Sequence, residues 1–285
     1  MPTRYNGIHK HQLFHWIGRH IDYPDGGAMA RRTRLKDEQR REYLACLRGI
    51  LAPDKGLWVK PPGEPDRLGD GSLVKVDRPI LCFTEWSLDE SLPHTMRYGR
   101  LGLGFPKQFV LRHGGQPVTY VRDRVHGDPF TRAMLVLARH LHGEGDREEG
   151  KAVREAFAYV SQFLKRIDRA EPSRLHRRRV HRRPPSARPP VRDPFRRSFG
   201  RTLEYLEERE WRIVFEEKIA KGWNRGRKEP PYYLPIRPGV ELFTVVLPDN
   251  RTVNLALGDR RLRDALFSKD APHVTILSLE DIGTF

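Results

Sequence analysis

The sequence has few cysteines and no long hydrophobic segment. Only Cys46 and Cys82 occur among its 285 residues, too few for the disulfide framework of a small secreted protein. No apolar run approaches the roughly 20 residues that span a bilayer. The first residues, MPTRYNGIHKHQLFHW, lack the apolar region and the small-residue cleavage site of a secretory signal. We therefore expect a protein of the reducing cytoplasm without a membrane partner.

Motifs of metal sites, nucleophiles and phosphate loops are also missing. The 12 histidines have no cysteine or carboxylate at a recurrent ligand spacing, and H-E-x-x-H does not occur. G-x-S-x-G is absent, and burial in an apolar strand would make Cys82 inert. The glycines of 99–104 are flanked by strand-like sequence and do not open a helix, as a phosphate-binding loop requires. We expect no metal site, and no cofactor unless the NAD-dependent alternative described below holds.

Basic residues, in contrast, are abundant and unevenly placed. Lys and Arg number 53 against 37 Asp and Glu, which gives a net charge of +16. Residues 174–197 contain ten arginines and one acid, Asp193, and so carry +9 of that charge (10 − 1 = 9). Guanidinium groups bind phosphate oxygens in bidentate fashion. A merely solvated surface, such as a GC-rich genome would encode, is the alternative. The uneven charge favours a nucleic-acid partner, bound mainly by Arg177, Arg178, Arg179, Arg182, Arg183, Arg196 and Arg197.

The same stretch predicts an interruption of the fold. Residues 171–197 contain six prolines and few large apolar side chains, which excludes a regular helix or a central strand. Such a segment cannot bury enough apolar surface to offset the entropy lost on ordering. We expect residues 171–200 to be a flexible, basic insertion, and residues 1–170 and 201–285 to form one domain.

The remainder of the chain predicts an α+β fold. Helical spacing of apolar residues predicts three helices in the first part of the chain, at 31–52, 128–143 and 148–167. Short apolar runs predict strands at 13–17, 79–86, 97–105, 109–113 and 117–123. Further on, we expect a helix turning into a strand at 203–217, two strands around the Pro-Asp-Asn turn within 240–258, a helix at 260–269 and a strand at 273–279. Such grouping is typical of a mostly antiparallel central sheet with flanking helices.

The segment EREWRI, residues 208–213, has the most unusual local pattern. Side chains alternate between the two faces of a strand, so Glu208, Glu210 and Arg212 would share one face. Arg209, Trp211 and Ile213 would share the other. A carboxylate beside an arginine on a sheet face is either a structural ion pair or an acid positioned in a cleft.

Several short motifs, taken in order, resemble the AbiGi family of abortive-infection (phage-defence) proteins. They are Leu13-Phe14-His15-Trp16, Cys82-Phe83-Thr84-Glu85, His94 with Tyr98-Gly99, Gly102 to Phe105, Pro117 to Val121, and Glu208 to Arg212. Glu85 stands where the family usually has Asp, and the Arg/Pro insertion is a further departure. The resemblance implies bacterial phage defence in a two-gene system, in which this chain would act with or regulate a partner toxin.

A weaker similarity is to the ADP-ribosyltransferase fold. Enzymes of that fold present a His or Arg on an early strand, a Tyr or Ser in the middle and a catalytic Glu on a late strand. The matching positions here are His15, Tyr98 and Glu210. The similarity implies an NAD-dependent toxin that modifies nucleic acid or protein. As an enzyme, the chain would fit this class better than a metal-dependent nuclease, because no carboxylate group has convincing metal-ligand spacing.

Overall fold

The computed structural model describes part of the chain, namely residues 12–23, 34–59, 66–67, 73–74, 79–121, 133, 136–137, 148–166, 209–215, 232–267 and 274–282. The chain divides into two compact units. The first comprises Met1–Pro62, Arg78–Gln116 and Glu210–Phe285, and the second Gly63–Asp77 and Pro117–Arg209. The single domain with an insertion at 171–200 stays a prediction, because residues 167–208 lie outside the described part of the chain.

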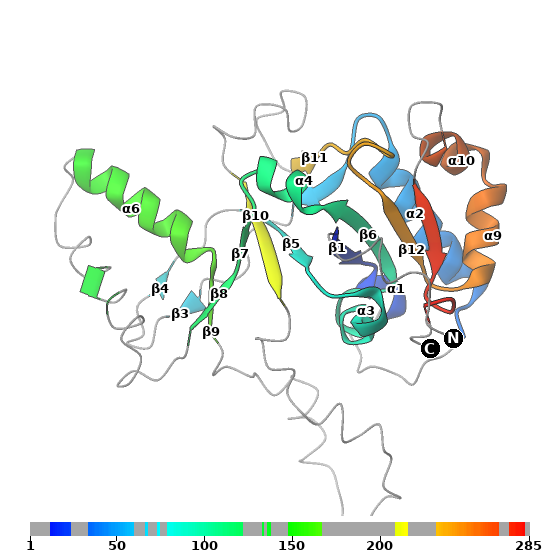
Figure 1. Cartoon of the computed structure of the whole chain (residues 1–285), viewed down its shortest axis with the longest axis horizontal. Helices are drawn as coiled ribbons and strands as arrows, with labels where there is room; N and C mark the ends of the chain where they lie inside the picture. Colours follow the sequence, from blue (N-terminus) through cyan, green and yellow to red (C-terminus); the bar gives the residue numbers. More distant parts are fainter. Residues whose placement is uncertain are drawn as a thin grey trace, which may run out of the picture. The chain divides into compact units, whose positions relative to one another are not determined.

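The helices and strands are numbered in chain order and labelled in Figure 1. The strands are β1 (Gln12–Ile17), β2 (Leu57–Val59), β3 (Asp66–Arg67), β4 (Leu73–Val74), β5 (Ile80–Thr84), β6 (Leu101–Pro106), β7 (Gln116–Pro117), β8 (Thr119–Val121), β9 (Leu164–Arg166), β10 (Glu210–Val214), β11 (Tyr232–Leu234), β12 (Thr244–Leu247) and β13 (Thr275–Ser278). The helices are α1 (Arg19–Asp22), α2 (Asp37–Leu51), the short 3₁₀ helix η1 (Leu88–Glu90), α3 (Leu92–Tyr98), α4 (Lys107–Arg112), α6 (Glu148–Ser161), α9 (Asn250–Gly258) and α10 (Arg260–Leu266).

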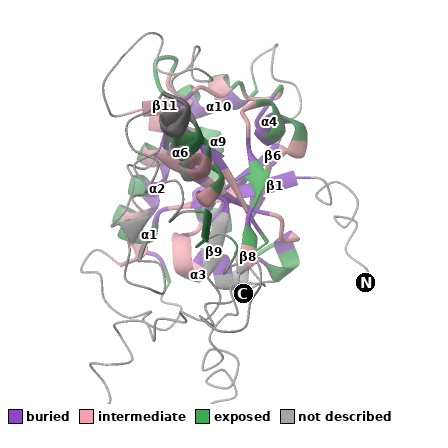
Figure 2. Ribbon diagram, turned by 90° about the vertical axis from the view of Figure 1, so that its left-hand side faces the viewer, coloured by how far each residue is buried: buried purple, intermediate pink, exposed green. Residues whose placement is uncertain are grey.

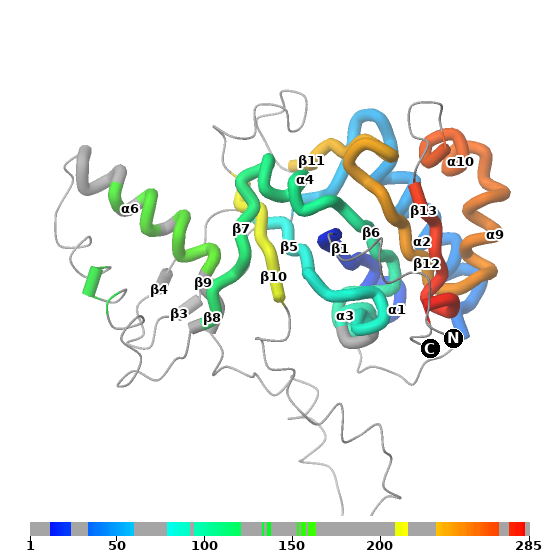
Figure 3. The backbone as a smooth tube through the Cα atoms, viewed as in Figure 1, coloured from blue at the N-terminus to red at the C-terminus, as the bar shows by residue number. Residues whose placement is uncertain are grey.

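A seven-stranded sheet organises the first unit. Its order is β13-β12-β6-β1-β5-β10-β7, and Figure 3 shows β1 between strands that come much later in the chain. The pairs of β1 with β5 and β6, of β10 with β5 and of β12 with β6 are antiparallel, whereas β12 and β13 are parallel. The predicted α+β fold with a mostly antiparallel central sheet and flanking helices is confirmed.

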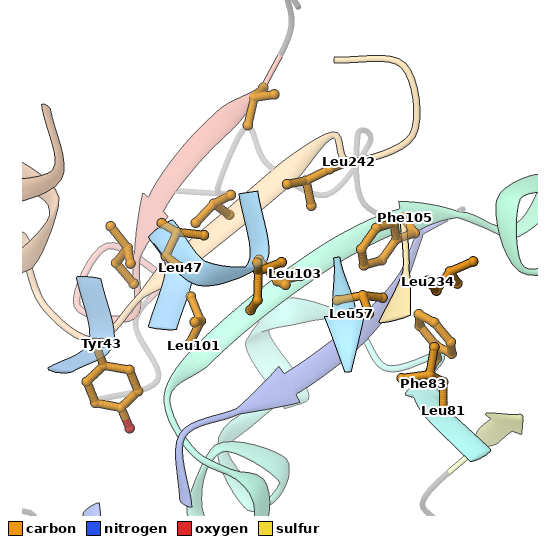
Figure 4. Packing of buried hydrophobic residues seen from close by; sticks show 14 of the residues in the cluster. Tyr43, Leu47, Leu57, Leu81, Phe83, Leu101, Leu103, Phe105, Leu234 and Leu242 are labelled. Carbon is orange, nitrogen blue, oxygen red and sulfur yellow. The ribbon is translucent and has the colours of Figure 1, made fainter. Parts of the chain in front are cut away.

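The main hydrophobic core lies on one face of this sheet, under α2, α9 and α10. Figure 4 shows Tyr43 and Leu47 of α2 together with strand residues such as Leu103. The apolar positions of α2 recur at helical spacing and are buried, as predicted, since one stripe of an amphipathic helix must face the core. We call this side of the sheet the helix-covered face. Its strand residues include Leu13, Leu81, Phe83, Leu101, Leu103, Phe105, Ile213 and Val245.

A smaller apolar cluster lies on the second face of the same sheet. It contains Phe14, Trp16, Leu88, Val246, Leu277 and Leu279, with Tyr98 and Ile282 packed against it. β1 therefore contributes large side chains to both faces, and Figure 2 shows it almost entirely buried. Gly102 and Gly104 of β6 make room on this face, because a Cβ at Gly102 would come within 2.6 Å of the Trp16 ring. The glycines of β6 thus allow close approach of side chains.

Two segments predicted as strands are helices. Residues 107–112 form α4, in which Phe109 is fully buried and stacks on Phe105 with ring centroids 4.8 Å apart. After β12, residues 250–258 form α9 and not the second strand of a hairpin. The Asp249 side chain caps that helix by accepting a hydrogen bond from the Thr252 backbone N–H at 2.8 Å. The Pro-Asp-Asn sequence is therefore a helix start and not a hairpin turn.

The described residues of the second unit include the β3–β4 hairpin, the parallel pair β8–β9 and helix α6. The helix was predicted from the spacing of its apolar residues. Val153 and Val160 are 46% and 50% exposed.

Among the described residues, no helix combines the length and hydrophobicity that a membrane span requires.

Candidate functional site

The three residues proposed for a catalytic role come from three separate elements of the first unit. His15 lies in the middle of β1, Tyr98 is the last residue of α3, and Glu210 is the first residue of β10. Glu210 is buried, with 7% of its surface exposed. All three residues are described, so the structure decides whether they meet.

The strand register places His15 and Glu210 on opposite faces of the sheet. Thr84 of β5 is the partner of Phe14 on one side and of Glu210 on the other. Residues directly opposite each other in antiparallel strands project from the same face. Phe14, Thr84 and Glu210 therefore form one row on the second face. His15 follows Phe14 in the strand and so projects from the helix-covered face.

The surroundings of His15 agree with this placement. Its Nδ1 donates a hydrogen bond to the carbonyl oxygen of Cys82 at 2.7 Å, and its ring lies 5.5 Å from that of Phe83 in the main core. Burial lowers the pKa of His15, although the hydrogen bond to Cys82 opposes this effect. His15 is therefore a hydrogen-bonded histidine of the core. The structure therefore does not bring His15 together with Glu210, and Tyr98 stacks on His94.

Polar side chains from three different elements meet on the second face. Glu210 accepts a hydrogen bond from Arg212 Nε at 2.8 Å, and these two residues share a face because they are two positions apart in β10. Thr84 lies directly opposite Glu210, and its Oγ1 is 3.5 Å from His94 Nε2 of α3. His94 and Thr84 are as buried as Glu210, with 4% and 5% exposed. We call these four residues, Thr84, His94, Glu210 and Arg212, the polar cluster.

Aromatic rings border the polar cluster. The indole of Trp86 meets the His94 imidazole edge-on, with ring centroids 4.8 Å apart. Tyr98, one helical turn after His94, stacks on the same imidazole at 6.0 Å with only 14° between the planes. The guanidinium of Arg97 lies 5.3 Å from the centre of the Tyr98 ring. Trp86, Arg97 and Tyr98 are half-buried, so they connect the buried cluster with the surface.

Two features around the polar cluster are energetically unfavourable by themselves. The Nε1 of Trp86 is buried and has no hydrogen-bond partner in the described part of the chain. A buried donor without a partner costs roughly 1–3 kcal/mol. Arg209, directly before Glu210, has a backbone φ of +40°, the one non-glycine residue with positive φ among those described. Backbone strain of this kind is concentrated at functional sites.

The helix-covered face carries a separate charged group near the same strands. Trp211 donates a hydrogen bond from Nε1 to Glu85 Oε2 at 2.8 Å, and Lys107 forms an ion pair with Glu85. The Lys107 ammonium lies 5.6 Å from the centre of the Trp211 ring. The Glu85 carboxylate thus has both an indole N–H and an ammonium group as partners within this group.

The remaining predicted residues cannot be placed. Arg177, Arg178, Arg179, Arg182, Arg183, Arg196 and Arg197 lie outside the described residues, as does Glu208. In the described ranges, no group of three or more His, Cys, Asp and Glu side chains is arranged to hold a metal ion.

The sequence contained a pattern that could have identified His94, a residue of the polar cluster that was not proposed for catalysis. His94 and Tyr98 are four positions apart, the spacing that puts two side chains on one helix face. That segment was predicted to begin a strand at residue 97, but residues 92–98 form α3. Read as a helix, the spacing would have paired His94 with Tyr98. The strand alternation predicted that Glu210 and Arg212 share a face, and the ion pair, one of the two interpretations it left open, is present.

Comparisons of the chain with known protein families, with curated proteins and with solved structures found no match.

Proposed function

We propose that the protein binds nucleic acid through the arginines of residues 174–197. The observation that carries this proposal is the concentration of +9 of the net charge of +16 in 24 residues. Arginines that neutralise phosphates release condensed counterions, which gives affinity with little dependence on base sequence.

The charges of the first unit support this assignment by contrast. Arg40, Arg48 and Arg251 on its helices each form an ion pair with an aspartate, with N–O distances of 2.8, 2.7 and 2.9 Å. A guanidinium engaged by a carboxylate in the same protein attracts a polyanion less strongly, because the two charges largely cancel at a distance. The segment 174–197 has only Asp193 to offset its ten arginines.

We further propose, from the resemblance to the AbiGi family, that the protein works in the cytoplasm of a bacterium in phage defence. There it would act with, or regulate, a partner toxin of a two-gene system. Co-purification of a second chain encoded next to this one tests this part. The proposal is contradicted if this chain copurifies with no product of a neighbouring gene and if deletion of its gene leaves phage resistance unchanged.

The binding proposal is tested with three full-length proteins. In one variant ten arginines become glutamine, and in the matched control the same ten become lysine, so that length and prolines stay constant. The positions are Arg174, Arg177, Arg178, Arg179, Arg182, Arg183, Arg188, Arg192, Arg196 and Arg197. Binding of labelled single-stranded RNA, single-stranded DNA and duplex DNA is measured by fluorescence anisotropy between about 50 and 200 mM salt.

The glutamine variant is expected to bind more weakly and with a smaller salt dependence. Each lost phosphate contact reduces the slope of log K against log salt by about 0.9 on duplex DNA and about 0.7 on a single strand. The lysine control should keep most of the slope, because lysine retains the charge. Equal affinity and equal slope in the glutamine variant and the unmodified protein would refute the proposal.

A further inference from the structure

The polar cluster has the composition of an acid–base site for phosphate chemistry. It combines a carboxylate, an imidazole, a hydroxyl and a guanidinium on the second face of the sheet, which also carries the smaller apolar cluster. Burying such groups costs free energy that apolar substitutes would not cost. Residues that lower the stability of the fold are expected at sites where a protein catalyses a reaction.

Glu210 and His94 are both neighbours of Thr84. Glu210 is the cross-strand partner of Thr84, and Cα atoms of such partners are about 4.5–5.5 Å apart. His94 Nε2 reaches the same threonine hydroxyl at 3.5 Å. Glu210 and His94 are therefore both neighbours of Thr84, and a carboxylate and an imidazole near one centre are the groups that can take a proton from it and deliver one to it.

Positive and donor groups border this pair. Arg212 forms an ion pair with Glu210, which stabilises the ionised carboxylate that a general base requires. The half-buried Arg97 and the buried Trp86 N–H, which has no hydrogen-bond partner in the described ranges, lie on either side of His94 and Tyr98. Donors fixed in this way stabilise the negative charge that develops on phosphate oxygens.

We propose that the polar cluster cleaves RNA without a metal ion. The 2′-hydroxyl of a ribonucleotide attacks the adjacent phosphorus and gives its proton to the carboxylate of Glu210. The bond from the 2′ oxygen to phosphorus forms while the bond from phosphorus to the 5′ oxygen breaks, and the protonated imidazole of His94 gives its proton to that leaving oxygen. The products are a 2′,3′-cyclic phosphate and a 5′-hydroxyl, and both side chains regain their starting protonation by exchange with water.

This inference rests on the proposed function in one respect, since RNA has to be the nucleic acid that the protein encounters. In this reaction Glu210 is the general base, His94 is the general acid, and Arg212 and Trp86 hold the phosphate. A 2′-hydroxyl is essential in this scheme, so DNA is bound but not cut.

The experiment uses the full-length protein and a 20-nucleotide RNA pool of random sequence, so that base preference does not limit the result. The same pool with 2′-O-methyl groups is the matched substrate control, and every reaction contains EDTA. The variants are Glu210→Gln and His94→Gln, purified in parallel with Glu85→Gln. Glu85 is a second sheet carboxylate in an ion pair, but it belongs to the group with Lys107 and Trp211 on the opposite face. Thermal melts show that each variant is folded.

The expected result is EDTA-resistant cleavage that leaves 2′,3′-cyclic phosphate ends, identified by mass spectrometry, with no cleavage of the 2′-O-methyl pool. Glu210→Gln and His94→Gln should each lose at least about 100-fold in rate, as removal of a general base or acid does, while Glu85→Gln keeps the full rate. The rate should follow a bell-shaped pH profile, which a structural role would not produce.

Absence of cleavage in the unmodified protein overturns the inference, as do cleavage of the 2′-O-methyl pool and equal rates in Glu210→Gln and Glu85→Gln. If a variant fails to fold, the 2′-O-methyl comparison and the product ends in the unmodified protein still decide the matter. Binding without cleavage refutes this inference alone. Cleavage by the protein whose segment arginines are glutamine, with unchanged RNA affinity, refutes the proposed binding segment alone.

Discussion

The ion pair between Arg40 and Asp249 predicts a large difference between two chemically identical mutations. Arg40 is 3% exposed and donates hydrogen bonds from Nε and Nη2 to Asp249 Oδ2 at 3.0 and 2.8 Å. Asp249 also caps α9 through Thr252. Asp259 caps α10 in the same way, because its side chain accepts a hydrogen bond from the Arg261 backbone N–H at 2.9 Å. Its ion-pair partner, Arg48, is 42% exposed at its side chain.

Changing either aspartate to asparagine keeps the helix cap, because asparagine caps as well as aspartate does. Asp249→Asn leaves the buried Arg40 guanidinium without its main counter-charge, and Asp37 at 2.8 Å is the partner that remains among the described residues. Removing one partner of a buried ion pair costs about 3–5 kcal/mol, and we expect the lower end, about 3 kcal/mol, because Asp37 persists. Asp259→Asn affects an exposed pair and should cost less than about 1 kcal/mol.

Urea unfolding followed by circular dichroism measures both variants, with the free-energy change taken from the shift in midpoint at constant m-value. A double variant, Arg40→Met with Asp249→Asn, removes the buried charge as well and should recover part of the loss. The reasoning is refuted if Asp249→Asn and Asp259→Asn lose the same stability to within about 1 kcal/mol. A double variant less stable than Asp249→Asn would also contradict it.

Two further predictions concern packing and pH. Gly102→Ala should destabilise by about 1–3 kcal/mol because its Cβ would come within 2.6 Å of the buried Trp16 ring, whereas Gly258→Ala, with no atom within 4 Å, should be neutral or slightly stabilising in the same urea assay. Burial alone would raise the pKa of Asp249, but hydrogen bonds from Arg40 and Thr252 outweigh it and lower that pKa below its ordinary value. The stability that depends on this carboxylate is therefore present above the unfolded-state pKa of about 3.9 and is lost as pH falls through the lower folded-state pKa. The stability difference between the unmodified protein and Asp249→Asn should shrink as pH is lowered below about 4; a difference that grows in this range would contradict the assignment.

The parts of the fold that the sequence predicted are those with a clear helical period or a short apolar or alternating run. The apolar stripe of α2 follows from helical periodicity, and the strands β1, β5, β10 and β13 follow from short runs. Helices α4 and α9 were missed because short apolar runs do not distinguish a strand from a buried helix turn. In α9 the decisive interaction is a hydrogen bond of the Asp249 side chain to Thr252, and a Pro-Asp-Asn sequence fits a turn and a helix cap equally well.

The candidate site could be predicted within one strand but not across the sheet. Alternation in β10 correctly placed Glu210 and Arg212 together, since a period of two relates residues of the same strand. No such pattern existed for β1, because Leu13, Phe14 and Trp16 are all buried and a strand buried on both faces has no polar side. Which face His15 occupies depends on the pairing of Phe14 with Thr84, two residues that are 70 positions apart. A slip of one residue in that pairing would have moved His15 to the face of Glu210. The register between distant strands, which only the folded chain determines, is therefore what separates His15 from the polar cluster and puts His94 in its place.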